Sequence, residues 1–114
     1  MDIDMLRKIC SSLPAATEDI KWGNDLVFSV GDKMFCAASL TPPFNCSFKV
    51  SDEQFDELSN QPGFMPAPYM ARAKWVLVND ASKLSKKEWE TYIKQSYELV
   101  KAKLTKKLRK DLNI

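Results

Sequence analysis

The start of the chain places its apolar residues at the spacing of a helix. The residues on this face are Ile3, Leu6, Ile9, Cys10 and Leu13. Asp2 or Asp4 is available as the N-cap, and Pro14 closes the segment. The pattern predicts a helix from about residue 3 to residue 12.

The pattern then changes to short runs of β-branched, aromatic or alternating apolar residues, which are typical of strands. Four strands are predicted, over residues 17–22, 26–30, 34–40 and 46–50. Between the second and third, Gly31 and Asp32 predict a tight two-residue hairpin, because glycine adopts the positive φ that such a turn requires. Pro42 and Pro43 predict a wider, extended connection before the fourth strand.

Two capping boxes mark the helices of the second half. Ser51 followed by Gln54 predicts a short helix over residues 52–60, and Ser85 followed by Glu88 opens the longest helix. The inner stripe of the long helix consists of Trp89, Ile93, Tyr97, Val100 and Leu104. The same stripe would next meet Lys107, so we expect the regular helix to end near residue 105. Residues 106–114 are then expected to form a basic tail that frays or turns.

Between these helices lie a proline-rich segment and one more strand. Three prolines and a glycine interrupt residues 61–69 and deny them regular hydrogen bonding, yet Phe64, Met65 and Tyr69 make the segment too apolar for a plain linker. We predict an ordered loop here, followed by a fifth strand over residues 75–78. The order of elements favours an α+β two-layer sandwich, with an antiparallel sheet of about five strands and helices packed on one face.

Composition fits one domain over residues 1–114. The chain is 45% apolar and 28% charged, as expected for a folded core. It has no histidine, which excludes Ser-His-Asp and Cys-His catalysis and the commonest zinc sites. Its three cysteines, Cys10, Cys36 and Cys46, form no CxxC pair and are expected to be buried thiols of a cytoplasmic protein. Charged residues interrupt the N-terminal MDIDMLRKIC, so we expect neither a signal peptide nor a membrane span there.

The chain resembles the MmcQ/YjbR family of small bacterial proteins over essentially its whole length. The resemblance rests on the opening helix ending in LP and on the segments TEDIKWGNDLVFSVGDKMFCAASL, FKVSDEQFDEL, PGFMPAPYMARAKWVLV and SYELVKAKL. Its most specific element leads from the proline-rich loop through Lys74 into Trp75 and the next strand. The resemblance implies a frataxin-like (CyaY-like) fold and a proposed double-wing role in DNA binding.

Charge is distributed unevenly. The formal net charge is +2, but residues 1–82 carry 11 acidic and 7 basic side chains, whereas residues 83–110 carry 3 acidic and 10 basic ones. Nucleic-acid binding requires cations that replace the counterions of phosphate. The candidate contacts are Lys33, Lys49, Arg72, Lys74, Lys106, Lys107, Arg109 and Lys110. The alternatives are a solvated helix end for the tail and ordinary solvent-facing strand positions for Arg72 and Lys74.

Aromatic and proline residues offer a second candidate surface. Pro66, Pro68 and Tyr69 belong to a stiffened loop that could present side chains to a ligand or partner at little entropic cost, or could simply cover the sheet. Trp22, Trp75 and Trp89 lie on predicted strands or a helix among apolar neighbours, so we expect them in the core.

The sequence predicts no metal site and no cofactor. The carboxylates of Asp52, Glu53, Asp56 and Glu57 lie one helical turn apart, but acidic residues near a helix start stabilise the helix without any metal. Frataxins carry an acidic ridge on their first helix, which here holds only Asp2 and Asp4, followed by Arg7 and Lys8. No glycine-rich phosphate loop is present either.

The leading hypothesis is a cytoplasmic, monomeric and non-enzymatic module that binds DNA. The alternative is a module that binds a protein or small molecule through the proline-rich loop at residues 62–69, which the near-neutral net charge favours. An enzyme would need a Cys, Lys or Tyr activated by its surroundings.

Overall fold

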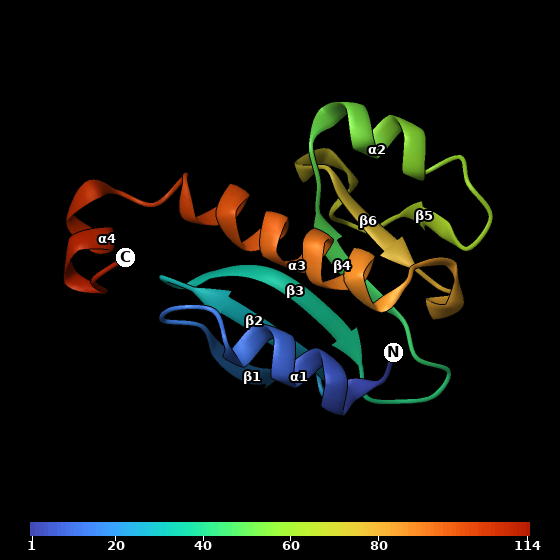
Figure 1. Cartoon of the computed structure of the whole chain (residues 1–114), viewed down its shortest axis with the longest axis horizontal. Helices are drawn as coiled ribbons and strands as arrows, with labels where there is room; N and C mark the ends of the chain where they lie inside the picture. The colour runs from blue at the N-terminus through green and yellow to red at the C-terminus, as the bar shows by residue number, and fades with distance from the viewer.

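A computed structural model describes all 114 residues (Figure 1). The longer elements are α1 (Ile3–Ser11), β1 (Thr17–Lys21), β2 (Asp25–Val30), β3 (Lys33–Ser39), β4 (Cys46–Lys49), α2 (Asp52–Leu58), β6 (Trp75–Val78) and α3 (Lys86–Lys101). The shorter ones are β5 (Phe64–Pro66), the single-turn helices η1 (Ala71–Ala73) and η2 (Ala81–Lys83), and α4 (Lys106–Asp111). The predicted α+β class is confirmed.

The strands form one open antiparallel sheet in the order β1-β2-β3-β4-β6-β5. Figure 1 shows α3 running across β3 and β4, with α1 in front of β1 and β2. Helix α2 packs near β5 and β6. No helix covers the opposite face of the sheet, which we call the open face (Figure 1). The helices therefore bury one face, as the sequence predicts.

The core lies between the helices and the covered face. The stripe predicted for the long helix is buried along its whole length, and it meets Leu6 and Cys10 of α1. Aromatic rings tie the layers together, since Phe35 of β3 packs edge-on against Tyr97 with ring centres 5.4 Å apart. The Tyr97 hydroxyl donates to the Pro14 carbonyl at 2.6 Å, which holds the end of α1 against α3.

Local sequence signals explain where the helices begin. Asp2 caps α1 by accepting from the Met5 amide, and both predicted capping boxes are present, at Ser51 with Gln54 and at Ser85 with Glu88. The predicted helix 52–60 is shorter in the structure and ends at Leu58.

The predicted Gly31–Asp32 hairpin is also confirmed. Both turn residues have positive φ, 55° at Gly31 and 68° at Asp32. Positive φ at both central positions is the conformation of a two-residue type I′ hairpin turn. Just beyond the turn, the β2–β3 register shifts after Phe28, so that Phe35 and Cys36 are both buried in the core.

Two sequence predictions of strand content are wrong in part. The sheet has six strands rather than five, because Phe64–Pro66 of the expected loop pairs with β6 as β5. Pro66 is tolerated there because β5 is an edge strand and its missing N–H breaks no ladder. The first strand ends at Lys21, so Trp22 lies in a turn and is 68% exposed rather than in the core. Trp75 and Trp89 are buried as expected.

A buried serine lies where β3 and β4 stop pairing directly. Their ladder covers only Cys36 to Ala38 on β3. Beyond it, the Ser96 hydroxyl of α3 accepts from the Lys49 amide at 2.9 Å and donates to the Phe35 carbonyl at 2.5 Å. Ser96 thus replaces a strand-to-strand contact with a bridge from the helix, and it fixes where the end of β4 lies.

The C-terminal tail is more ordered than the sequence predicts. The long helix ends at Lys101, before the expected limit, and the chain turns. Thr105 then caps α4, whose Leu108 packs against the core cluster together with Ile114. The tail turns but does not fray, because Leu108 has an apolar partner surface at the hairpin turn, where a Cβ on Gly31 would lie 3.0 Å from the Leu108 side chain.

Candidate functional site

Lys49 lies near cations from two other parts of the chain. It ends β4, is half-buried, and its ammonium group donates to the Ala73 carbonyl of η1. Burial lowers the pKa of Lys49, and the charge of Lys103 lowers it further, while Asp52 acts in the opposite direction. The end of β4, the η1 segment and the turn after α3 therefore meet here, although they are far apart in sequence.

Arg72 and Lys74 flank this point. They precede β6 rather than lying on it, so the expectation of ordinary strand positions is wrong. Arg72 on η1 is exposed, whereas Lys74 is half-buried with φ of 64° and ends the helical turn. Its ammonium lies 5.0 Å from the centre of the Phe55 ring, a cation–π contact that anchors the side chain. Arg72 is the freer cation of the two.

A second group of cations lies at the neighbouring β2–β3 hairpin. A Cβ on Gly31 would lie within about 3 Å of Leu104 and Leu108, so the turn touches the tail directly. Lys33 follows this turn and is exposed. On α4, Lys106, Lys107 and Lys110 are exposed and Arg109 is half-buried. Figure 1 shows α4, the end of α3 and this hairpin together at the left.

The basic residues therefore form two groups that Lys103 connects. We call the whole set the basic end, comprising Lys33, Lys49, Arg72, Lys74, Lys103, Lys106, Lys107, Arg109 and Lys110. The set contains the eight cations named from the sequence together with Lys103, and their role in binding nucleic acid stays a prediction. Lys103, between α3 and α4, belongs to the set because its charge acts on Lys49, a proximity that only the fold creates.

The open face carries a groove of about 570 Å³. Strand register places Ala37, Ser47 and Leu77 side by side on this face, since Ala37 opposes Ser47 and Ser47 opposes Leu77. Trp75, which opposes Lys49, also lines the groove. The remaining lining residues are Trp22, Asp25, Met34, Asn45, Ala67, Pro68, Tyr69 and Met70. Apolar and aromatic side chains predominate, as in many small-ligand sites.

Two exposed aromatic residues of the groove have unusual backbones. Trp22 is 68% exposed with φ of 53°, and Tyr69 is fully exposed with φ of 64°. A bulky side chain rarely adopts this left-handed conformation, and such strain clusters at functional sites. Of the predicted loop residues, Pro68 and Tyr69 line the groove, whereas the exposed Pro66 lies outside its lining.

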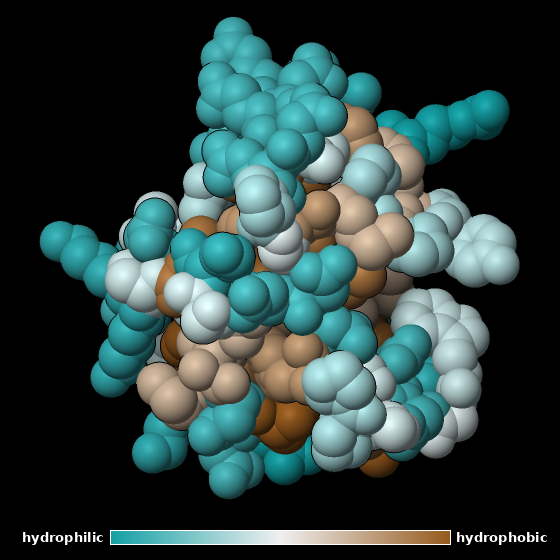
Figure 2. Space-filling model, turned by 90° about the vertical axis from the view of Figure 1, so that its right-hand side faces the viewer, coloured by the Kyte–Doolittle hydropathy of each residue, from teal (hydrophilic) through white to brown (hydrophobic).

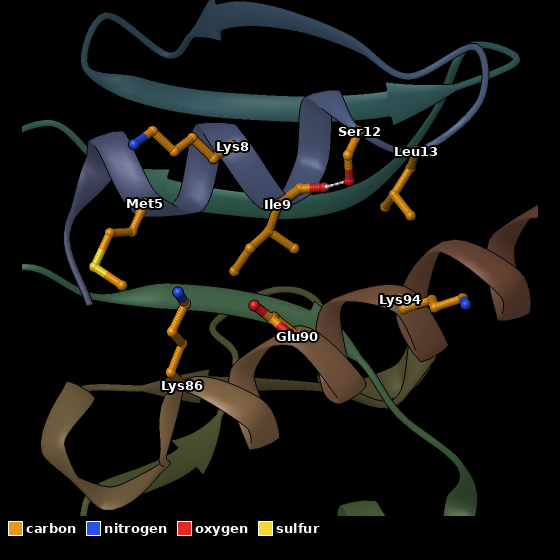
Figure 3. A pocket seen from close by; sticks show the side chains of 8 residues that line it. All are labelled: Met5, Lys8, Ile9, Ser12, Leu13, Lys86, Glu90 and Lys94. Atoms are coloured by element: carbon orange, nitrogen blue, oxygen red, sulfur yellow. Dashed lines mark hydrogen bonds between the residues drawn. The ribbon is translucent and has the colours of Figure 1, made fainter.

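A second hollow, of about 530 Å³, lies between α1 and α3. Figure 3 shows Ile9 of α1 pointing toward α3, while Lys86 and Glu90 point from α3 toward α1. Met5 and Leu13 add apolar surface, and cations and an anion alternate along α3. The lining carries three lysines and one glutamate, so positive charge exceeds negative charge in this hollow. Figure 2 shows hydrophilic side chains projecting around patches of apolar surface on the end of the molecule that is at the right in Figure 1.

The cysteines are buried side chains of the core. Cys10, Cys36 and Cys46 are fully buried, with the sulfur atoms of Cys36 and Cys46 3.4 Å apart. Burial raises the pKa of Cys36 well above its usual value, and its cysteine neighbours raise it further, so it remains a thiol. No three His, Cys, Asp or Glu side chains lie together as metal ligands. None of the helices has both the length and the apolar character needed to cross a bilayer.

Comparison with known proteins identifies the family. The YjbR family model matches residues 11–99, so the chain belongs to the YjbR family. A crystal structure of a Deinococcus radiodurans protein with a DUF419 domain superimposes with a TM-score of 0.88 at 28% identity, covering 98% of this chain and 88% of that one. A Pseudomonas syringae protein shares the fold, with a TM-score of 0.71 at 21% identity, covering 88% of this chain and 99% of that one. No curated protein matches this chain.

Proposed function

We propose that this YjbR-family protein binds nucleic acid, with DNA as the expected ligand, through the basic end. The observation that carries the proposal is the meeting of cations from separate parts of the chain around Lys49. Lys49 packs against residue 73 and lies within repulsive range of Lys103. Phosphate groups bound at this point would relieve that repulsion, and they are the anions that nucleic acid presents at regular spacing.

Binding at the basic end would depend on the local clustering of cations rather than on the net charge of the protein. A net charge of +2 gives little overall attraction to DNA, so binding has to depend on local concentration of cations. The hollow between α1 and α3 also contains three lysines, but Glu90 lies among them. The basic end also has carboxylates near it, since Asp52 acts on Lys49 and Asp32 and Asp111 adjoin Lys33 and Lys110, but its nine cations outnumber them.

We further propose that the protein acts as a monomer in the cytoplasm and without catalysis. The chain has no histidine, and its most perturbed nucleophile, Cys36, has its pKa shifted upward, away from the reactive thiolate. The phenol groups of Tyr92 and Tyr97 also have raised pKa values, mainly because of burial. None of these thiol and phenol groups is poised as a nucleophile or base near neutral pH. The pKa of Lys49 is lowered by burial, but its ammonium group is engaged as a donor to the Ala73 carbonyl.

Charge-neutralising variants test the proposal. The affinity for a fluorescein-labelled DNA duplex is measured by anisotropy at low salt for Lys103→Gln, Arg72→Ala and the triple variant Lys106→Gln, Lys107→Gln, Lys110→Gln. Each is expected to bind several-fold more weakly than the wild type because phosphate contacts are lost. Lys94→Gln is the matched control, because it removes the same charge from an exposed position on α3 outside the basic end.

The control should bind like the wild type. Equal affinity for all variants, or no binding of any DNA at low salt, would overturn the proposal. The alternative then remaining is a protein or small-molecule ligand at residues 62–69, which would be expected to bind without salt dependence.

A further inference from the structure

We infer that the groove on the open face receives unpaired bases, so that single-stranded nucleic acid is the preferred form of the ligand. This inference rests on the proposed function and names the substrate class of the same protein surface. Two exposed aromatic side chains with strained backbones border an apolar groove, and Trp75 of this groove is the cross-strand partner of Lys49.

The groove adjoins the part of the basic end around Lys49. Trp75 lines the groove and is the cross-strand partner of Lys49 on β4. The segment that follows Met70, another lining residue, carries Arg72 and Lys74. A strand whose phosphates follow these cations would therefore have its bases beside the groove. Cations that track a backbone next to aromatic faces are the arrangement by which proteins bind single strands.

The lining suits a flat heteroaromatic ring. Trp22 and Tyr69 present large π faces at its borders, and Met34 and Leu77 provide apolar surface between them. Asp25, Asn45 and Ser47 add hydrogen-bonding groups, which match the polar edges of a base. Base edges and faces are open to such contacts only when the base is unstacked, which is the state of a single strand.

Backbone strain gives a further argument. Trp22 and Tyr69 both adopt positive φ while remaining exposed. Burial of these side chains therefore does not offset the free-energy cost of their left-handed backbone. Glycine adopts this conformation without a steric penalty. An exposed aromatic residue at such a position is therefore poorly explained by stability and well explained by contact with a ligand.

Glycine variants separate stability from binding. Trp22→Gly and Tyr69→Gly are expected to unfold at the same temperature as the wild type or higher, because the left-handed backbone is relieved. Each is expected to weaken binding of a labelled single-stranded oligonucleotide by roughly 5- to 150-fold, the loss expected for one stacked base. Ile20→Ala is the control, because it also removes an exposed apolar side chain. Ile20 is 56% exposed and pairs with Leu26 on the helix side of the sheet, away from the groove.

An abasic oligonucleotide provides the second measurement. It keeps the phosphates but has no bases, so wild type and both glycine variants are expected to bind it equally and weakly, with the same salt dependence. Equal wild-type affinity for duplex and single strand, or glycine variants that bind the normal single strand like the wild type, would overturn the inference and leave the proposed function intact.

Two other outcomes are also informative. Absence of binding to any oligonucleotide at low salt would overturn the proposed function, and with it the inference. A change in sedimentation of the glycine variants, with unchanged oligonucleotide affinity, would assign the groove to contact between proteins and would likewise overturn the inference.

Discussion

Replacing Ser96 by alanine tests the structural basis of the basic end. The Ser96 hydroxyl is completely buried, and it bridges the Lys49 amide and the Phe35 carbonyl. Ser96→Ala leaves both backbone groups without this partner. An unsatisfied buried polar group costs about 1 to 3 kcal/mol. Because Lys49 is only half-buried and its amide can regain some water, we expect a total loss of about 2 to 4 kcal/mol in the free energy of unfolding.

Urea unfolding followed by circular dichroism measures this loss. Thr91→Ala is the matched control, because its hydroxyl also lies on α3 but donates locally to the Lys87 carbonyl at an exposed position. The control should change stability by no more than about 0.5 kcal/mol. If Ser96→Ala were as stable as the control, the bridge would not hold the end of β4 and the argument from buried polar groups would be wrong.

Three further predictions address other parts of the fold. Gly31→Ala should destabilise the protein by about 1 to 2 kcal/mol because of the positive φ at this position. A further cost is expected because the new Cβ would lie 2.8 Å from the Leu104 side chain. An unchanged melting temperature would refute this prediction. All three cysteines should resist alkylation in the native protein and react after denaturation, and rapid native labelling of any one would contradict their burial. Burial raises the pKa of Tyr97 in the folded state, so the stability that the neutral phenol contributes is complete below the usual tyrosine value of 10.0 and is lost as pH rises through the folded pKa. Tyr97→Phe should therefore reduce the loss of stability in that alkaline range. An unchanged pH profile of stability would contradict the raised pKa.

The sequence predicts most elements because their signals are local. Capping boxes at Ser51 and Ser85, the apolar stripe of the long helix and the Gly31 turn each depend on residues close together in the chain. The sixth strand was missed because prolines usually interrupt a sheet, and only the edge position of β5 makes Pro66 acceptable.

The candidate site was predictable only in part. The cations are visible in the sequence, but the proximity of Lys49 to Lys103 and residue 73 depends on how β4, α3 and η1 pack together. Trp22 was expected in the core because tryptophan is usually buried and its neighbours resemble a strand. The Gly23 that follows it is a turn signal that could have indicated exposure.

The salt dependence of DNA binding tests the central claim most directly. For the wild type, log affinity for a duplex should fall linearly with log salt concentration, with a slope of about 0.9 per phosphate neutralised. The triple variant Lys106→Gln, Lys107→Gln, Lys110→Gln should show a shallower slope, by about 1 for each phosphate contact that is lost, whereas Lys94→Gln should keep the wild-type slope. An affinity that does not change with salt, or the same slope in the triple variant and the wild type, would contradict binding of DNA at the basic end.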